Sequence, residues 1–246
     1  MKKFEKVLFI PDIHCPYHDE KALQVLYSFI NWHKPDTIFI TGDLLDGYAI
    51  SRFTKDPNGA LKFQSELDSA IEVLNDIRKR AKKAKIYFIR GNHEARLQKF
   101  LWSNAKELSG LHALELENLL ELKRLNIEYV KEGLIRYKGI IIKHGSIVRK
   151  YAGYTAKAEF EKNGCSGVSG HTHRQGSYRH TNSSDAYAWL ELGHLCDPNQ
   201  EYLEGEIANW QQGWGLGWFK NNSKKYYLEL VPLINYKAFY GGKEFI

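Results

Sequence analysis

The sequence predicts a single α/β domain in which two sheets pack together with helices outside them. The N-terminal half alternates short apolar runs with amphipathic helical stretches, a pattern typical of βαβ units and a mainly parallel sheet. The C-terminal half consists mostly of short strand signals separated by turns. No linker rich in Pro, Gly or Ser separates the two halves, so we expect one domain over residues 1–246.

Strands and helices alternate regularly in the N-terminal half. Short continuous apolar runs, as expected for buried strands, occur at residues 6–10, 36–40 and 86–89. Apolar residues recur with helical spacing over residues 19–32, where Asp19 is the expected N-cap, and over residues 61–81, whose basic end suits the helix dipole. Because ligands of open α/β sheets bind beyond the carboxyl ends of the strands, we expect a site at that edge.

The pattern changes after the third strand. Residues 94–124 are rich in Leu and helical in character, so we interpret them as a helical cap or excursion. Further short strands are expected at residues 127–130, 134–137, 140–143, 167–169, 178–180, 186–192, 214–219 and 226–232, with one helix at residues 155–162. From about residue 175 to residue 246, we expect these strands to form antiparallel hairpins.

Composition excludes several classes of protein. Lys and Arg number 35 against 29 Asp and Glu, which gives a formal net charge of +6, and the 43% of hydrophobic residues is typical of a globular protein. No apolar run approaches the ~20 residues of a membrane-spanning helix, so no membrane partner is expected. The odd number of cysteines, three, indicates reduced thiols and predicts a cytoplasmic location.

Five polar clusters carry the chemistry of the sequence, and each follows an apolar strand. In chain order they are Asp12-Ile13-His14, Gly42-Asp43-Leu44-Leu45-Asp46, Gly91-Asn92-His93-Glu94, His144-Gly145 and Gly170-His171-Thr172-His173. Imidazole together with carboxylate suits Mn, Fe, Ni or Zn. A single His or Asp at a strand end is usually a cap or a surface group, but capping does not require all five clusters. The set therefore predicts a metal centre.

The spacing within these clusters suits a pair of ions. Asp12 and His14 are two residues apart, as are His171 and His173, so on an extended segment each pair points to one side. A carboxylate such as Asp43 has two oxygens and can bridge two ions. Two ions about 3.5–4 Å apart can hold a hydroxide nucleophile and a phosphoryl oxygen together.

In these clusters the sequence resembles the calcineurin-like binuclear metallophosphoesterase superfamily. Its motifs D-x-H, GD-x-x-D, GNH-D/E, H-G and GH-x-H all occur here in that order, between Asp12 and His173. The resemblance implies a four-layer αββα sandwich, two mixed sheets flanked by helices, with a two-metal site. It implies these ligands: Asp12, His14 and His173 for the first ion, Asn92, His144 and His171 for the second, and Asp43 as the bridge.

The resemblance also implies the roles of residues around the ions. His93 matches the histidine that protonates the leaving group or steadies the transition state, and Asp46 resembles the carboxylate that orients it. The protein phosphatase branch has an arginine directly after its second motif, whereas Gly47 stands there in this chain. A protein phosphatase is therefore disfavoured, although Arg52 or Arg96 could replace that arginine. We expect Arg96, just past Gly-Asn-His-Glu, to contact the substrate, and Arg149 is a weaker candidate.

The sequence thus predicts a phosphoesterase with two divalent ions, Mn first and Fe, Ni or Zn as alternatives. A metal-activated hydroxide would attack phosphorus in line, on a phosphodiester in a nucleic acid or a nucleotide. The alternatives are a phosphomonoesterase, including a phosphoprotein phosphatase, and a metal-binding scaffold without turnover. The complete ligand set and His93 argue against a scaffold. A basic run at residues 78–85 permits a nucleic-acid partner, but a solvated helix end explains it better.

Overall fold

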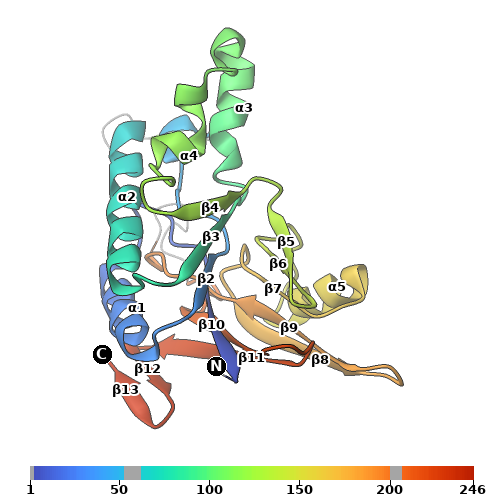
Figure 1. The fold of residues 1–246 in the computed structure, drawn as a ribbon. Coiled ribbons are helices and arrows are strands. Elements are labelled where there is room, and N and C mark those ends of the chain that lie inside the picture. The colour runs from blue at the N-terminus through green and yellow to red at the C-terminus, as the bar shows by residue number, and fades with distance from the viewer. Residues whose placement is uncertain (1–2, 53–61, 200–206) are drawn as a thin grey trace.

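Two sheets packed face to face form the centre of the protein, with helices on their outer sides (Figure 1). The computed structural model describes residues 3–52, 62–199 and 207–246. The predicted α/β sandwich of two mixed sheets and flanking helices is confirmed. None of the helices within these ranges is long and apolar enough to cross a membrane.

The larger sheet has eight strands in the order β13-β12-β11-β10-β1-β2-β3-β4. These strands are β1 (Phe4–Ile10), β2 (Thr37–Ile40), β3 (Lys85–Ile89), β4 (Ile127–Val130), β10 (Gly213–Lys220), β11 (Tyr226–Ile234), β12 (Lys237–Tyr240) and β13 (Lys243–Phe245). Strands β1 to β4 run parallel, as expected for βαβ units. The C-terminal strands join this sheet where β10 pairs antiparallel with β1.

The smaller sheet has five strands in the order β5-β6-β7-β9-β8. These strands are β5 (Leu134–Tyr137), β6 (Ile140–Lys143), β7 (Gly167–Ser169), β8 (Gln175–Thr181) and β9 (Ala186–Leu192). Strands β6, β7 and β9 are parallel, so the expected hairpin of β8 and β9 is attached to β7 through a parallel pair. Helix α5 (Tyr154–Asn163) contacts the outer side of this sheet.

The other helices lie away from the outer face of the smaller sheet (Figure 1). They are α1 (Glu20–His33), η1 (Tyr48–Ile50), α2 (Phe63–Arg80), α3 (Ala95–Asn104), η2 (Lys106–Leu108), η3 (His112–Leu114) and α4 (Leu116–Leu119). Among them, α1 and α2 pack on the larger sheet. Asp19 caps α1 by accepting hydrogen bonds from two main-chain N–H groups of the first turn. The predicted start of the second helix at Leu61 lies outside the described residues. Helix α3 extends away from both sheets (Figure 1).

Three apolar layers hold these elements together. Alternate residues of β1 to β3 point toward α1 and α2, and Ile38 packs there with Phe29. The other face of the same strands, with Phe9 and Phe39, packs against the smaller sheet. A third cluster, with Trp189 at its centre, lies beneath α5. Both faces of the strands are therefore buried, and the parallel strands are continuously apolar for this reason.

Candidate metal centre

The five polar clusters meet where the two sheets face each other. Each cluster begins within two residues of the end of β1, β2, β3, β6 or β7, and these strands end at the same edge of the sandwich. The structure brings all seven predicted ligands together there, in two overlapping groups. The ligands are Asp12, His14, Asp43, Asn92, His144, His171 and His173.

The first group consists of Asp12, His14 and His173. Nε2 of His14 lies 3.0 Å from Nε2 of His173, and the latter atom lies 3.6 Å from Oδ1 of Asp12. The other ring nitrogen of His14, Nδ1, lies 3.1 Å from Oδ2 of Asp46. All three predicted ligands of the first ion are thus in one place and buried.

The second group consists of Asn92, His144 and His171. Nε2 of His144 lies 2.9 Å from Oδ1 of Asn92 and 3.2 Å from Nδ1 of His171. Oδ2 of Asp43 is 3.2 Å from Nε2 of His144 and 3.9 Å from Nε2 of His14. One carboxylate oxygen therefore faces a ligand of each group, as a bridging carboxylate would.

The local backbone is strained in a way that aims these side chains inward. Five of the ligands have positive φ angles, which non-glycine residues rarely adopt: Asp12 (38°), His14 (56°), Asp43 (49°), His171 (76°) and His173 (58°). Such conformations cost on the order of 1–3 kcal/mol each and are typical of functional sites. The motif glycines provide space, because a Cβ on Gly91 would lie 2.1 Å from Asp43 Oδ1 and one on Gly170 would lie 2.2 Å from Asp12 Oδ2.

The arrangement of lone pairs fits bound cations. Nδ1 of His144 lies 3.0 Å from the main-chain oxygen of Thr41, so in the neutral ring that an ion requires Nδ1 carries the proton and the lone pair of Nε2 points toward Asn92 and Asp43. In the same way, Nδ1–H of His14 donates a hydrogen bond to the Asp46 carboxylate, and Nε2 of His14 faces Nε2 of His173. A metal ion binds between such atoms, because ring nitrogens and carboxylate oxygens that carry no proton can direct their lone pairs to it. Two nitrogens bound to one ion at about 2.1 Å and at right angles would lie about 3 Å apart.

Burial and mutual charge shift the pKa values of these groups in opposite directions. Burial raises the pKa of Asp12 to about 7. Burial would also raise the pKa of Asp43, but the neighbouring charges of His144 and His93 hold it well below its usual value. Burial would lower the pKa of His144, but the charge and hydrogen bond of Asp43, together with the charges of Asp12 and Glu94, raise it to about 10. So wide a spread among groups in contact is a mark of a functional site.

His93 lies beside the ligands and contacts Asp46 and Arg96. Its Nδ1 lies 2.7 Å from the main-chain oxygen of Asp46 and 3.6 Å from the Asp46 carboxylate. The expected orienting contact therefore comes from the main chain, whereas the carboxylate faces His14. Arg96 donates to the same carbonyl at 2.8 Å and lies 3.1 Å from Nε2 of His93. The structure thus places Arg96 next to the residue that was expected to act in catalysis.

Several supporting residues were not assigned a role from the sequence. The buried Glu94 accepts hydrogen bonds from the main-chain N–H groups of Gly91, Asp43 and Leu45 and so ties two ligand loops together. Glu191 accepts from Thr172, which lies between two ligands, and from Gly153 N at 2.8 Å. The sequence signal for Glu191 was its charge, because it is a glutamate within the otherwise apolar end of β9.

The remaining predicted arginines lie at the periphery. Arg149 lies on the loop after His144 and is exposed, and its main-chain oxygen accepts a hydrogen bond from Arg174. Arg52 is also exposed.

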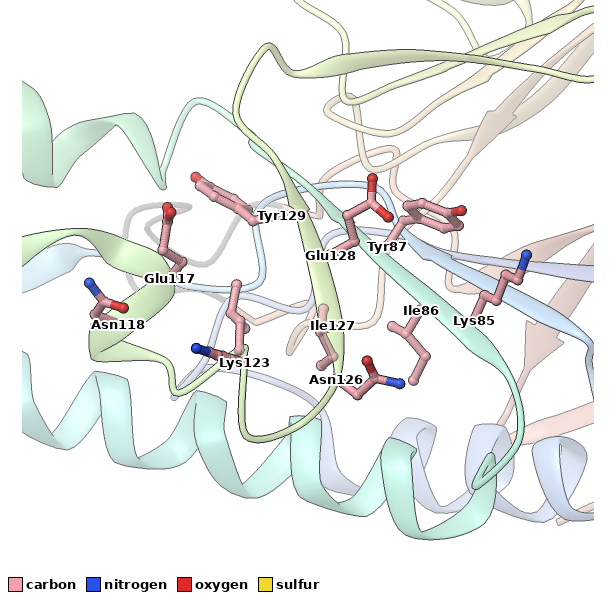
Figure 2. A pocket seen from close by; sticks show the side chains of 11 residues that line it. Lys85, Ile86, Tyr87, Glu117, Asn118, Lys123, Asn126, Ile127, Glu128 and Tyr129 are labelled. Atoms are coloured by element: carbon pink, nitrogen blue, oxygen red, sulfur yellow. The ribbon is translucent and has the colours of Figure 1, made fainter.

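A separate hollow of about 700 Å³ lies at the β3–β4 edge, with Lys85, Glu117 and Tyr129 among its lining residues (Figure 2). No predicted ligand lines this hollow, so it is distinct from the metal centre.

The chain is similar to known proteins over most of its length. A family model described as calcineurin-like phosphoesterase matches residues 5–206. Gene 54 proteins of Mycobacterium phages D29 and L5 are 29% and 28% identical to the chain, each over 94% of both sequences. Among solved structures, Vacuolar Protein Sorting 29 from Cryptosporidium parvum has a TM-score of 0.49 at 13% identity, covering 99% of this chain and 95% of that one. YfcE, a phosphoesterase from E. coli, has a TM-score of 0.42 at 14% identity, covering 87% and 90%.

Proposed function

The chain belongs to the calcineurin-like phosphoesterase family and is a metal-dependent phosphoric ester hydrolase, and from this premise we propose that it uses two divalent ions to cleave a phosphodiester in a nucleic acid or a nucleotide. The position of Asp43 carries the two-ion part of the proposal. Its Oδ2 faces His144 Nε2 at 3.2 Å and His14 Nε2 at 3.9 Å, and these histidines belong to different ligand groups. Mn is the first candidate metal for this mixture of imidazole and carboxylate, with Fe, Ni and Zn as alternatives.

The side chains divide the work between binding and catalysis. When bound, two divalent ions activate a water for in-line attack on phosphorus and neutralise phosphoryl charge. Asp12, His14 and His173 would hold one ion, Asn92, His144 and His171 would hold the other, and Asp43 would contact both. His93 faces Asp43 Oδ2 at 3.8 Å and packs edge-on against His14, with ring centroids 4.5 Å apart. We assign it to the leaving group rather than to an ion.

Arg96 supports the preference for a diester. One terminal nitrogen of its guanidinium donates to Asp46 and the other lies against His93, so only part of its donor fork remains for the substrate. A phosphomonoester dianion carries one more negative charge than a diester and gains more from a free guanidinium clamp. We therefore propose that Arg96 contacts one phosphoryl oxygen and that the site favours the singly charged diester.

Hydrolysis of two generic substrates tests the function. We expect the purified protein with Mn to cleave an aryl phosphodiester faster than the matching aryl phosphomonoester, and to cleave neither without metal. His93→Asn is the control that shows whether any turnover belongs to this site. Faster cleavage of the monoester would favour the phosphomonoesterase alternative. Binding of metal without turnover of either ester would favour the scaffold.

The cellular location remains a proposal that rests on the cysteines. Their odd number makes complete pairing impossible, and Cys15, Cys165 and Cys196 are all free thiols in the structure. We propose a cytoplasmic location on this basis. Alkylation of thiols in freshly lysed cells, followed by mass spectrometry, would test whether all three are reduced in place.

A further inference from the structure

The segment from Gly193 to Cys196 forms a wall behind the first ligand group. Leu195 N donates to the main-chain oxygen of Asp12 at 3.0 Å, and Leu195 O accepts from Asp19 N, the cap residue of α1, at 2.9 Å. The next strand holds the segment from the other side, because His194 O accepts from Gly213 N at 3.2 Å. His194 and Cys196 are both 1% exposed. The wall is therefore buried, held by main-chain hydrogen bonds on both sides, and bonded directly to the main chain of Asp12, a predicted ligand.

The ring of His173 faces this wall with its second nitrogen. Since Nε2 of His173 points to His14 and Asp12, the proton of the neutral ring belongs on Nδ1. Nδ1 lies 4.0 Å from Sγ of Cys196, and that sulfur lies 3.0 Å from Nδ1 of His194. The rings of His173 and His194 are nearly parallel, with centroids 5.1 Å apart, and Trp210 packs edge-on against His173 at 4.4 Å.

Histidine ligands of metals almost always direct the other ring nitrogen to a polar partner, which fixes the ring orientation and tautomer. Carboxylates, carbonyls and waters are the usual partners. Two of the other three histidine ligands follow that rule, since His14 faces Asp46 and His144 faces the Thr41 carbonyl. For His173, the polar group facing Nδ1 is the thiol of Cys196, and His194 contacts that thiol.

We propose that Cys196, held by His194, is the positioning partner of His173 and sets the affinity of the ion that His173 binds. This inference rests on the two-ion centre of the proposed function. Sulfur is a weak, polarisable acceptor, so the contact orients the imidazole without placing a second buried charge behind the ion. Replacement of partners of this kind costs about 10–100-fold in metal affinity.

The test is a metal titration of the full-length protein after removal of its ions. Mn and Co are titrated in competition with a chelator, so that both stepwise affinities and the final stoichiometry are measured. We compare wild type, Cys196→Ala and Cys196→Ser, with Cys165→Ala as the matched control. Cys165 is a half-buried thiol that packs in the cluster beneath α5. Ala and Ser leave nearly the same space, but only Ser keeps a hydrogen-bonding atom.

We expect Cys196→Ala to weaken one ion about 10-fold or more and to leave the other unchanged. Cys196→Ser should recover most of that loss, and the Co absorption spectrum should change for the weakened site alone. The stability of the metal-free protein should be similar in both Cys196 variants, because they differ little in packing. Cys165→Ala should match wild type in every measurement.

Three outcomes would overturn the inference. Equal affinities in wild type and Cys196→Ala would show that the thiol positions nothing. Equal losses in Ala and Ser variants, together with a less stable metal-free protein, would show a packing role. A third bound ion with a thiolate-to-Co absorption band would show that His173, His194 and Cys196 are themselves ligands. A wild-type protein that binds fewer than two ions would instead contradict the proposed function, on which this inference depends.

Discussion

The guanidinium of Arg96 lies 3.1 Å from Nε2 of His93, the nitrogen that faces the carboxylate of Asp43. Nδ1 of His93 donates to the Asp46 carbonyl at 2.7 Å, so Nε2 has no proton and accepts from Arg96. Burial lowers the pKa of His93 to about 4, which agrees with a neutral ring. We expect His93 to donate a proton only after Arg96 moves away and Nε2 becomes protonated.

His93→Asn should separate catalysis from metal binding. We expect the rate to fall by ~10²–10⁴, because a group that transfers a proton or stabilises charge in the transition state is lost. The content of bound metal should remain that of wild type, as measured by elemental analysis. Asp43→Asn is the comparison and should empty or disorder the centre. Loss of both ions from His93→Asn would show that His93 is a ligand rather than a catalytic residue.

Arg96→Lys should lower kcat/KM by about 10–100-fold, because losing a charge-assisted hydrogen bond costs about 1.5–3 kcal/mol and Lys cannot reproduce the planar donor fork. If Arg96 acts mainly by positioning His93, Arg96→Lys should lower kcat. The same substitution should then cause little further loss of rate in a protein that already carries His93→Asn. Arg124→Lys, on the surface beside Glu121, is the control. Independent, additive losses in the double variant, with a raised KM, would assign Arg96 to substrate binding alone.

Removal of the ions should destabilise the protein and abolish activity. The ligands lie on loops that follow strands of both sheets, so each ion cross-links the sandwich and binds the folded state alone. An ion at one hundred times its dissociation constant adds about 2.7 kcal/mol of stability. Thermal unfolding with chelator, and again after Mn is restored, measures the effect. Full activity in a sample verified to be free of metal would contradict a metal-dependent reaction.

Local sequence predicted most of the strands and the candidate ligands, but not the residues that support those ligands. Each ligand occurs in a short motif directly after an apolar run, so position along the chain was enough to find it. Strands β12 and β13 were missed because Phe239 is 69% exposed and neither strand shows an alternating apolar pattern. The contact of Cys196 with His173 depends on the pairing of distant strands, which no local pattern reports. Likewise, the sequence did not show that Arg96 turns back onto His93.

His33 should make the fold less stable in acid. It is 2% exposed, stacks on Phe29 with ring centroids 5.1 Å apart, and has an Nε2 without a hydrogen-bond partner in the described structure. Burial, followed by the charge of Lys6, lowers its pKa from 6.5 to about 4. The unfolded state therefore binds more protons in this range, so stability is complete above about pH 6.5 and is lost as the pH falls toward about 4.

The measurement compares wild type with His33→Phe, which removes this titration. Between about pH 7.5 and about pH 5, wild type should lose roughly 2 kcal/mol more unfolding free energy than the variant. Denaturant unfolding of both proteins at each pH gives the difference, and other titrating groups cancel because they are shared. Parallel pH profiles for the two proteins would contradict the low pKa of His33.

Binding of a single-stranded oligonucleotide should depend only moderately on salt. The basic end of α2 is largely used within the protein: Arg78 donates to four main-chain carbonyls, and Arg80 pairs with Asp76 at 3.1 Å. We therefore expect phosphate contacts to come from the loop that follows His144, where Arg149 and Lys150 are exposed. Two to four contacts predict a slope of log affinity against log salt of about −1.4 to −2.8, at ~0.7 for each contact with a single strand.

The experiment uses the His93→Asn protein with its metals, so that the oligonucleotide is bound but not cleaved. In that background Arg149→Gln should reduce the slope by about 0.7, whereas Lys79→Gln, on the exposed end of α2, should leave it unchanged. A steep slope that Lys79→Gln reduces would show that the basic helix end binds nucleic acid after all. A flat slope, or no binding at low salt, would exclude an extended nucleic acid and leave a nucleotide or another small phosphate ester as the substrate, because such a ligand presents only one or two phosphates to the site.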